Sequence, residues 1–456
     1  GAISMTNPQV APKIVIIGAG SLEFSSRLTA DCLSYPALAG AHFALVDTDA
    51  ERLSFAGRIF DRIVEAGGYE ASCSLHSEVT EALPGAQFVI VSILVGGYEA
   101  IEVEIDIPMK YGVSQAIGDT LTPGGIMRCL RTLPVQSAIA QHITALCPDA
   151  LVLNYTNPMS MLCEGMLNAA PSLNLVGLCH SVQSTTEQWA KRLNQSMSDV
   201  TFECAGLNHQ AWITRFEVHA EDQLPAIRKL AVNPEVWRDD TSRMEYIKHF
   251  GYPVTEASGH NSEYSSWFRK SEADIKRYCP GGGWNGGHGF IKSLYNRPDW
   301  RDTMERMASG ETPIDLRRSL EYGSQIIHAA TTGIPETIYG NVRNAALISN
   351  LPDWAIVEVA CTVDQSGIRP QPYGALPEHL AAINRSQASV QHLAVQAAES
   401  MDPEIVFQAM CLDPLTSTVL GLDDIRAMTR ELLAAHRPFL PDAWTNQPLQ
   451  DQPRLA

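Results

Sequence analysis

The sequence lacks long apolar runs, an excess of basic residues and paired cysteine spacings. No apolar run reaches the roughly 18 residues of a membrane span, and the N-terminus lacks the basic and then apolar profile of a secretory signal. The 33 basic and 51 acidic residues give a formal net charge of −18, which disfavours nucleic acids and anionic membranes as partners. Ten scattered cysteines are typical of reduced thiols. We therefore expect a cytoplasmic protein that binds neither nucleic acid nor membrane.

The N-terminal residues carry part of a dinucleotide-binding pattern. An apolar, β-branched run at residues 13–17 leads into Gly18 and Gly20 and then into a helical pattern. Gly18 would allow the tight turn, and Gly20 and Ser21 would lie where the helix N-terminus meets a pyrophosphate. The third glycine of the pattern is absent because Glu23 occupies its place. The match is therefore incomplete, and the two glycines alone are a weak indication of a dinucleotide site.

Further apolar segments alternate with helical patterns, which is typical of a parallel, doubly wound sheet. They are residues 42–46, 87–94, 150–154 and 173–179. The first of these segments is followed by Asp47, whose carboxylate suits ribose hydroxyls and would repel a 2′-phosphate. This favours NAD over NADP, although Asp47 could equally be an ordinary turn residue at a strand end. Ligands of such sheets lie at the carboxyl ends of the strands, where Asn154 and Asn157 are found.

The regular alternation weakens after about residue 194, and a chain of 456 residues exceeds what one core usually supports. We predict a Rossmann-like NAD-binding domain over residues 5–195. An α+β, mostly helical, substrate-binding domain should follow over residues 196–445, giving an overall arrangement like that of malate and lactate dehydrogenases. The helical patterns of this second region are residues 316–331, 380–399 and 423–436.

Two apolar segments of the chain end in Cys179-His180 and in His209. A thiolate and an imidazole suit a borderline divalent metal, and two protein ligands would leave positions open for substrate oxygens. The alternative is that Cys179 is a buried core cysteine and His209 a hydrogen-bonded core histidine. The spacing alone does not decide, because it is no compact C-x-x-C or H-E-x-x-H array.

Two polar segments concentrate groups that could contact a substrate or transfer protons. A glycine and proline loop at residues 117–128 carries Asp119 and Arg128, and residues 250–264 include Glu256 and Tyr264. Each segment is either part of an active site or a polar surface turn. The run at 341–344, which contains Arg343, is likewise either a turn or a set of donors.

The ordered motifs together resemble the NAD-dependent glycoside hydrolases of family 4, most closely the melibiase (α-galactosidase) branch. The resemblance covers nearly the whole chain and rests on Gly18-Ala-Gly-Ser21, Gly96-Gly-Tyr-Glu99, residues 119–128, Asn154-Tyr-Thr-Asn-Pro-Met159, residues 177–183, Ala205-Gly-Leu-Asn-His209, Val254-Thr-Glu256, residues 339–344 and Leu412-Asp-Pro414. It implies a cleavage that differs from the usual two-carboxylate scheme. NAD⁺ oxidises C3 of the sugar, a base removes the C2 proton, the aglycone leaves from C1, and water adds.

The resemblance also implies roles for individual residues. NAD would be bound by Gly18, Gly20, Ser21, Asp47 and Asn154, and Mn²⁺ or another divalent metal by Cys179 and His209, although metal independence is an alternative. The substrate would contact Asn157, Arg128, His260, Asn261 and Arg343. The catalytic groups would be His180 as proton donor to the leaving group, Asp119, and either Glu256 or Tyr264 as base. Relatives form dimers and tetramers, so we expect a homodimer or homotetramer.

The substrate is either an α-galactoside or an anionic hexoside, namely a galacturonoside, glucuronoside or sulfoquinovoside. Gly259 stands where α-galactosidases carry an acid and Asn261 adds an amide, a change that an anionic sugar would favour. The glycine-rich residues 281–289 have basic neighbours at Lys270, Lys276, Arg277 and Lys292. The alternatives are an NAD-dependent 2-hydroxyacid dehydrogenase and a non-catalytic NAD-binding protein, neither of which needs the cysteine, histidine and 256–264 groups together.

Overall fold

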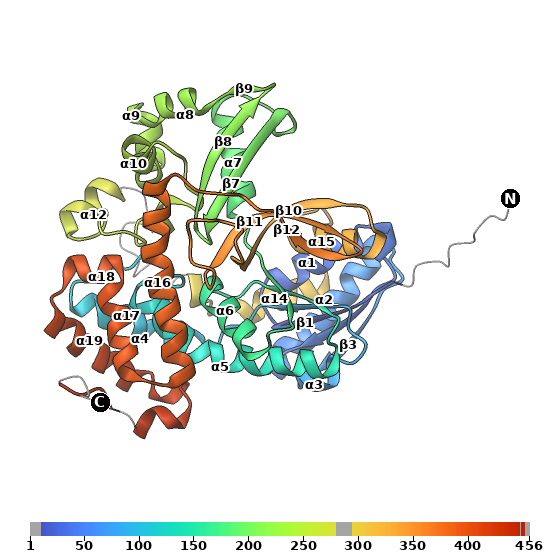
Figure 1. Ribbon diagram of the computed structural model, residues 1–456. Coiled ribbons are helices and arrows are strands. Elements are labelled where there is room, and N and C mark those ends of the chain that lie inside the picture. The colour runs from blue at the N-terminus through green and yellow to red at the C-terminus, as the bar shows by residue number, and fades with distance from the viewer. Residues whose placement is uncertain (1–10, 280–293, 447, 452–456) are drawn as a thin grey trace.

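The computed structural model describes residues 11–279, 294–446 and 448–451. Its described strands form one 12-stranded sheet in the order β3-β2-β1-β4-β5-β6-β10-β11-β7-β8-β9, with β12 paired to β11 (Figure 1). The first half is parallel and consists of β1 (Lys13–Ile17), β2 (His42–Val46), β3 (Ser72–His76), β4 (Phe88–Val91), β5 (Leu151–Asn154) and β6 (Asn174–Gly177). The order 3-2-1-4-5-6 is that of dinucleotide-binding sheets. The predicted Rossmann-like sheet is confirmed.

Helices cover both faces of the parallel half. They are α1 (Phe24–Leu33), α2 (Ala50–Gly67), α3 (Val79–Ala82), α4 (Gly97–Lys110), α5 (Thr122–Leu146), α6 (Met159–Ala169) and α7 (Ser181–Arg192). The strands are apolar on both faces, as in the fully buried β4, because a parallel sheet must be covered on each side. Helix α2 begins where the side chain of Asp49 accepts from two backbone N–H groups and ends at the left-handed Gly68.

The second half of the sheet is antiparallel and extends the first rather than standing apart. It contains β7 (Val200–Leu207), β8 (Gln210–Val218), β9 (Glu221–Asp222), β10 (Glu336–Arg343), β11 (Ile356–Asp364) and β12 (Gly367–Pro370). The β10–β11 hairpin lies between β6 and β7, although β7 ends at Leu207 and β10 begins only at Glu336. The two regions of the chain therefore share one sheet.

The remaining helices pack around the second half of the sheet, against α1 and α2, and against α4 and α5. They are α8 (Leu224–Ala231), α9 (Pro234–Asp239), α10 (Thr241–Phe250), α11 (Ser258–Asn261), α12 (Glu272–Tyr278), α14 (Trp300–Ser309), α15 (Tyr322–Thr332), α16 (Glu378–Ser400), α17 (Pro403–Leu412), α18 (Pro414–Val419) and α19 (Leu422–Ala435). Helices α16 to α19, orange to red in Figure 1, bury a second core against α5 that includes Val390, Met410 and Leu432. This agrees with the predicted helical layer.

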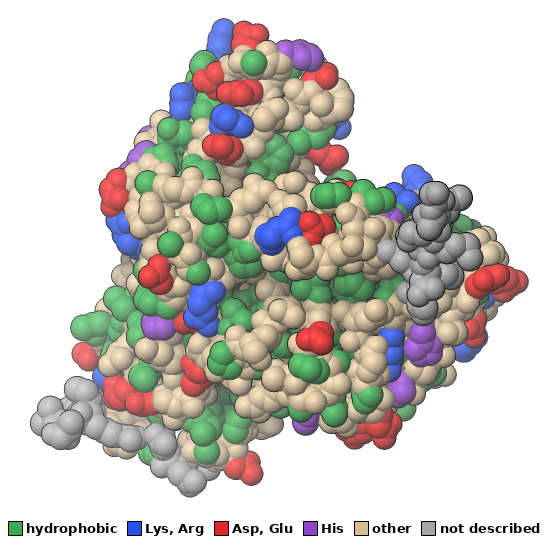
Figure 2. All heavy atoms as spheres, turned by 45° about the vertical axis from the view of Figure 1, so that its right-hand side comes forward, with side chains coloured by type: hydrophobic (Ala, Val, Ile, Leu, Met, Phe, Trp, Pro, Cys, Tyr) green, Lys and Arg blue, Asp and Glu red, His purple; other side chains and the backbone are tan. Residues whose placement is uncertain are grey.

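Two sequence expectations about the surface can be compared with the structure. No helix in the described part of the chain is long and apolar enough to cross a bilayer. On the face shown in Figure 2, basic side chains are scattered among acidic ones rather than gathered into one patch. Such a surface offers no obvious attraction to a polyanion.

Candidate active site

Cys179, His209 and Glu256 place one donor atom each within 4.8 Å of the other two. Cys179 follows β6, His209 lies in the turn between β7 and β8, and Glu256 follows the bridge residue Val254. The Cys179 Sγ lies 3.4 Å from His209 Nε2, which lies 3.2 Å from Glu256 Oε2. A thiolate, an imidazole and a carboxylate suit a borderline divalent ion and leave coordination positions open. The two ligands predicted from the sequence come together, and the structure adds Glu256 to them.

Two of these three donors have unusual backbone conformations. His209 has φ +65° and Glu256 has φ +73°, in the left-handed region that side chains with a Cβ rarely adopt. Such a conformation costs on the order of 1 kcal/mol or more and is found mainly at functional sites. Each residue lies two positions after a β-segment, His209 after Leu207 and Glu256 after Val254, and the donor atoms of both lie close to the Cys179 Sγ. No spacing rule applied to the sequence reveals this.

Thr120 and Tyr264 hold the outer nitrogen of the His209 ring. His209 Nδ1 lies 2.8 Å from Thr120 Oγ1 and 3.1 Å from the Tyr264 hydroxyl. A metal-binding histidine is normally oriented by such a hydrogen bond on its other nitrogen. The Tyr264 side chain is only 1% exposed, and burial raises its pKa well above the ordinary value. The structure therefore places this candidate base behind His209.

Glu256, His260 and Asp119 form a chain of charged groups beside the donors. His260 Nδ1 lies 3.1 Å from Glu256 Oε1, and its Nε2 lies 3.8 Å from Asp119 Oδ1. Burial opposes charge on both members of the first pair. Even so, His260 and His209 hold the pKa of Glu256 below its ordinary value, and Glu256 and Asp119 raise the pKa of His260. The carboxylate of Glu256 is thus kept ionised, as a metal ligand must be.

His180 directly follows Cys179 in the sequence and is exposed. Its Nδ1 lies 3.2 Å from Glu321 Oε1, and this hydrogen bond raises the pKa of His180 to about 9. A protonated imidazole next to a donor residue can give a proton to a leaving group. Glu321, which immediately precedes α15, was not identified from the sequence, where it is one ordinary acid in a polar stretch.

Two buried acids fix the loop that carries Asp119. Glu263 accepts hydrogen bonds from the backbone N–H groups of Ala116, Ile117 and Gly118 at 2.6, 3.1 and 2.9 Å. Asp413, from the Leu-Asp-Pro motif, accepts from the N–H of Thr122 at 2.9 Å. Within residues 256–264, Glu256, His260 and Tyr264 therefore lie at the donor cluster, whereas the Glu263 carboxyl supports the loop.

Arg128 is buried near the same loop with part of its guanidinium unused. It is 4% exposed, and its Nη1 donates to the Tyr295 hydroxyl at 3.3 Å. Within the described residues its Nε and Nη2 have no hydrogen-bond partner, and neither does the buried Oδ1 of Asn157. Buried polar atoms are normally satisfied, so these atoms are candidates for contacts with a bound molecule.

Three predicted site residues use their polar groups elsewhere. Asn261 is fully buried and donates to Gln210 Oε1 at 2.9 Å. Arg343 donates to the Asn168 side chain and to a backbone carbonyl. Asn154 bonds within its own strand end. These hydrogen bonds therefore lie away from Cys179, His209 and Glu256, and the substrate- and NAD-binding roles predicted for the three residues stay predictions.

The basic residues expected around an anionic sugar do not converge on the donors. Lys270 pairs with Asp274 at the surface, and Lys276 and Arg277 are both exposed on the short helix α12. Residues 281–289 and Lys292 lie outside the described residues. Among the described residues, Arg128 is a buried cation that interacts electrostatically with Asp119 of the predicted site.

The glycine loop after β1 has the form that a dinucleotide site requires. Gly18 has φ +93°, and a Cβ there would lie 1.8 Å from the Ser92 carbonyl oxygen. The Gly20 N–H donates to Asp47 Oδ2 at 2.8 Å, and a Cβ at Gly20 would lie 2.6 Å from that oxygen. Each Asp47 oxygen accepts one backbone bond and retains a lone pair for a ribose hydroxyl. Both roles of Asp47, turn residue and ribose ligand, remain compatible with this geometry.

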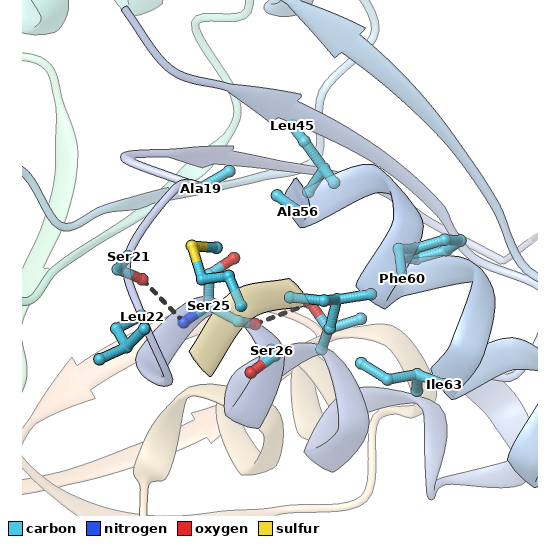
Figure 3. Close-up of a pocket in the computed structure, with 12 residues that line it drawn as sticks. Ala19, Ser21, Leu22, Ser25, Ser26, Leu45, Ala56, Phe60 and Ile63 are labelled. Atoms are coloured by element: carbon cyan, nitrogen blue, oxygen red, sulfur yellow. Dashed lines mark hydrogen bonds between the residues drawn. The ribbon is translucent and has the colours of Figure 1, made fainter. Parts of the chain in front are cut away.

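A small cavity lies behind this loop, between α1 and α2, and Figure 3 shows its lining. Ser21 accepts there from the N–H of Ser25 at 3.0 Å, so its hydroxyl supports the start of α1. The cavity measures about 10 Å³, room for roughly one water. It belongs to the packing of the loop and does not accommodate a dinucleotide.

The sequence of the chain matches known proteins over nearly its whole length. Residues 13–195 match the model of family 4 glycosyl hydrolases, and residues 204–416 match that of the family's C-terminal domain. The α-galactosidase of Bacillus subtilis is 38% identical, over 94% of this chain and 99% of that one. The α-galactosidase of Rhizobium meliloti is 34% identical (94% and 89%), and the α-galacturonidase of Lachnoclostridium phytofermentans 29% (95% and 97%).

Solved structures share the fold. The LplD protein of Bacillus subtilis superimposes with a TM-score of 0.82 at 26% identity, covering 92% of this chain and 99% of that chain. A 6-phospho-α-glucosidase from gut microorganisms, solved with NAD and Mn²⁺, has a TM-score of 0.78 at 19% identity, with coverage of 95% and 99%. Two models of the same family together span most of the chain, and relatives above 30% identity cover nearly all of it. The protein belongs to glycoside hydrolase family 4.

Proposed function

We propose that the protein hydrolyses α-galactosides with NAD⁺ and a divalent metal, by oxidation at C3, removal of the C2 proton, elimination from C1 and addition of water. The observation that carries this proposal is the Cys179, His209 and Glu256 cluster at the end of β6. β1, which carries the glycine loop, and β6 are parallel and lie three strands apart. Their carboxyl ends therefore share one edge of the sheet about 14 Å apart, at 4.7–4.9 Å per strand.

The residues of the chain divide the chemistry between them. Cys179, His209 and Glu256 would hold the metal, and when bound it would polarise sugar oxygens at C2 and C3. His180, paired with Glu321, would protonate the departing aglycone. Glu256 and Tyr264 remain the two candidates for the base that takes the C2 proton. NAD⁺ would lie along the glycine loop, with its ribose hydroxyls at Asp47.

A neutral sugar is favoured by the relatives and by the charges at the site. The α-galactosidases of Bacillus subtilis and Rhizobium meliloti are 38% and 34% identical to this chain, whereas an α-galacturonidase of Bacillus subtilis is 30% identical. The Asn261 amide, which would have offered a donor to an anion, donates to Gln210 instead. The surroundings of the donors are rich in carboxyl groups, namely Asp119, Glu256, Glu263 and Glu358. This acidic environment disfavours a further negative charge on the substrate.

A second candidate substrate, an anionic hexoside such as a galacturonoside, is supported by Arg128. Two nitrogen atoms of its buried guanidinium, Nε and Nη2, have no hydrogen-bond partner among the described residues, although Nε lies 3.8 Å from Glu104 Oε1. A substrate carboxylate could accept hydrogen bonds from both. α-Galacturonidases are also among the relatives, at 29% identity in Lachnoclostridium phytofermentans.

A substrate panel tests the proposal. Nitrophenyl α-galactoside, α-galacturonide, glucuronide and sulfoquinovoside would be assayed with NAD⁺ and Mn²⁺, and we expect the neutral galactoside to have the highest kcat/KM. A preference for a charged sugar, abolished by Arg128→Met, would establish the second candidate instead. NADH is followed in the same reactions. Its stoichiometric accumulation would indicate a dehydrogenase, because the hydrolytic cycle returns the hydride.

We also propose that the enzyme works in a cytoplasm as a homodimer or homotetramer. All ten cysteines are free, which fits a reducing compartment. Light scattering of the purified protein would measure the assembly.

A further inference from the structure

The strands that lead to Cys179 and His209 are joined through the β10–β11 hairpin. β6 pairs with β10 at Gly177 and Asn341, and β7 pairs with β11 at Gly206 and Glu358. Asn341 and Glu358 also face each other within the hairpin. In this register, a polar pair contacts β6 two residues before the cysteine and β7 three residues before the histidine.

The side chains of this pair are buried and bonded to each other and to β6. Asn341 is 1% exposed and Glu358 is 0% exposed. The Asn341 Nδ2 donates to the Gly177 carbonyl at 3.1 Å and to Glu358 Oε2 at 3.0 Å. A Cβ at Gly177 would lie 3.0 Å from the Asn341 Cβ, so the glycine gives the asparagine its room. The amide therefore fixes the strand from which Cys179 emerges.

Burying Asn341 and Glu358 in apolar surroundings is energetically unfavourable. The neighbouring hairpin residues Val342, Val357 and Val359 belong to the apolar core. Glu358 Oε1 has no hydrogen-bond partner among the described residues, and burial raises the pKa of this carboxyl to about 7. Apolar side chains would serve stability alone better, since burying an incompletely bonded carboxyl is unfavourable. A role in the neighbouring site explains why the cost is accepted.

The carboxyl lies close to the donors themselves. Burial, Glu256 and Glu358 together raise the pKa of the Cys179 thiol, and His209 favours the ionised form of Glu358. Asn208, which directly precedes His209, is 2% exposed and lies in the same buried region. Glu358 is thus close to both metal-site strands while itself outside the set of three donors.

We propose that Asn341 and Glu358 are a positioning pair that holds Cys179 and His209 at the separation a metal ion requires. This role rests on the proposed metal site. Interactions behind metal ligands commonly contribute 10- to 100-fold in affinity. The pair acts through shape and hydrogen bonding, so an amide at residue 358 should replace the carboxyl.

The test measures Mn²⁺ binding by calorimetry in Glu358→Gln, Glu358→Ala and Asn341→Ser, each compared with wild type. We expect Mn²⁺ affinity to fall about 10-fold or more in Glu358→Ala and Asn341→Ser and to stay within about threefold in Glu358→Gln. Glu164→Ala is the matched control, because Glu164 is a similarly buried acid that bonds His392 on a different helix. NAD⁺ affinity should be unchanged in all four variants. A Co²⁺-substituted enzyme adds a spectroscopic readout, since displacement of the thiolate shifts its charge-transfer absorption.

Unchanged Mn²⁺ affinity and Co²⁺ spectrum in Glu358→Ala or Asn341→Ser would overturn the inference. So would equal losses in Glu358→Gln and Glu358→Ala, which would show that charge rather than position matters. If Glu358→Ala does not fold, the Asn341→Ser and Glu358→Gln pair decides in the same way. Cys179→Ser distinguishes a failure of the positioning role from a failure of the metal site. If it binds Mn²⁺ as wild type does, the metal site itself is wrong and the positioning role falls with it.

Discussion

Replacement of Tyr264 by phenylalanine distinguishes the two roles open to this tyrosine. Its hydroxyl lies 3.1 Å from His209 Nδ1 and 3.3 Å from Thr120 Oγ1, in a side chain that is 1% exposed. From this geometry we expect Tyr264→Phe to loosen a metal ligand rather than to remove a base. The ring volume is kept, so no cavity forms and the fold should remain intact.

The size of the effect follows from the hydrogen bonds lost. One neutral hydrogen bond contributes about 0.5–1.5 kcal/mol, and Thr120 remains on the same nitrogen. Mn²⁺ affinity should therefore fall by about 2- to 12-fold, at 1.4 kcal/mol per factor of ten. Turnover should recover when Mn²⁺ is raised to saturation. Thr120→Val is the matched control, because it removes the other hydroxyl on His209 and should give a similar loss.

The assay combines Mn²⁺ titration with turnover of a C2-deuterated substrate. A loss of more than about 10²-fold in kcat at saturating Mn²⁺, with unchanged Mn²⁺ affinity, would refute this reasoning, because general bases contribute about 10²–10⁴-fold. An increased isotope effect at C2 in Tyr264→Phe would support that outcome. An unchanged isotope effect in Glu256→Gln would then exclude the carboxylate as base.

Three further predictions concern other parts of the structure. Cys179→Ser and His209→Ala should each cut turnover by orders of magnitude without unfolding, as measured by kinetics and circular dichroism; activity that survives exhaustive chelation would instead indicate metal independence. Asp47→Ala should weaken NAD⁺ by about 1–3 kcal/mol in calorimetry, and unchanged affinity would leave Asp47 as a turn residue. Although burial opposes the charged form of Asp240, Arg243 holds the pKa of this carboxyl below its ordinary value. The ion pair therefore stabilises the fold above the ordinary carboxyl pKa, and this stabilisation is lost as pH falls through the lower folded-state pKa. Acid denaturation of Asp240→Asn should lack this pH-dependent component.

The parallel half of the fold could be predicted because its strands are covered on both faces. β1, β2, β4, β5 and β6 form continuous apolar runs, the pattern that burial on both sides demands. β3 was not predicted. It lies at the edge of the sheet, and its residues Ser72–His76 are exposed or half-buried, so its sequence carries no apolar run. Apolar runs in the sequence identify buried strands, and they miss an exposed edge strand such as β3.

The metal ligands could be predicted from the local pattern only where they follow strands. Cys179 and His209 end apolar segments and were found in that way. Glu256 joins them through a left-handed turn, and nothing in the run 256–264 itself indicates which of its groups face the donors. Glu256 and His260 are four residues apart and meet on one side of a helical turn. Asn261 points to Gln210 on the other.

The placement of the β10–β11 hairpin between β6 and β7 could not be predicted from local sequence patterns, and the site depends on this placement. The parallel sheet alone brings the glycine loop and Cys179 to one edge, but it supplies no second metal donor. His209 and Glu256 come from the second region, which meets β6 only through this hairpin among the described strands. The cofactor loop and the donor cluster therefore depend on different parts of the sheet. Substitutions in the hairpin should weaken metal binding while NAD⁺ binding persists, whereas substitutions at Gly18 should do the reverse, because a Cβ there collides with the Ser92 backbone and not with any donor.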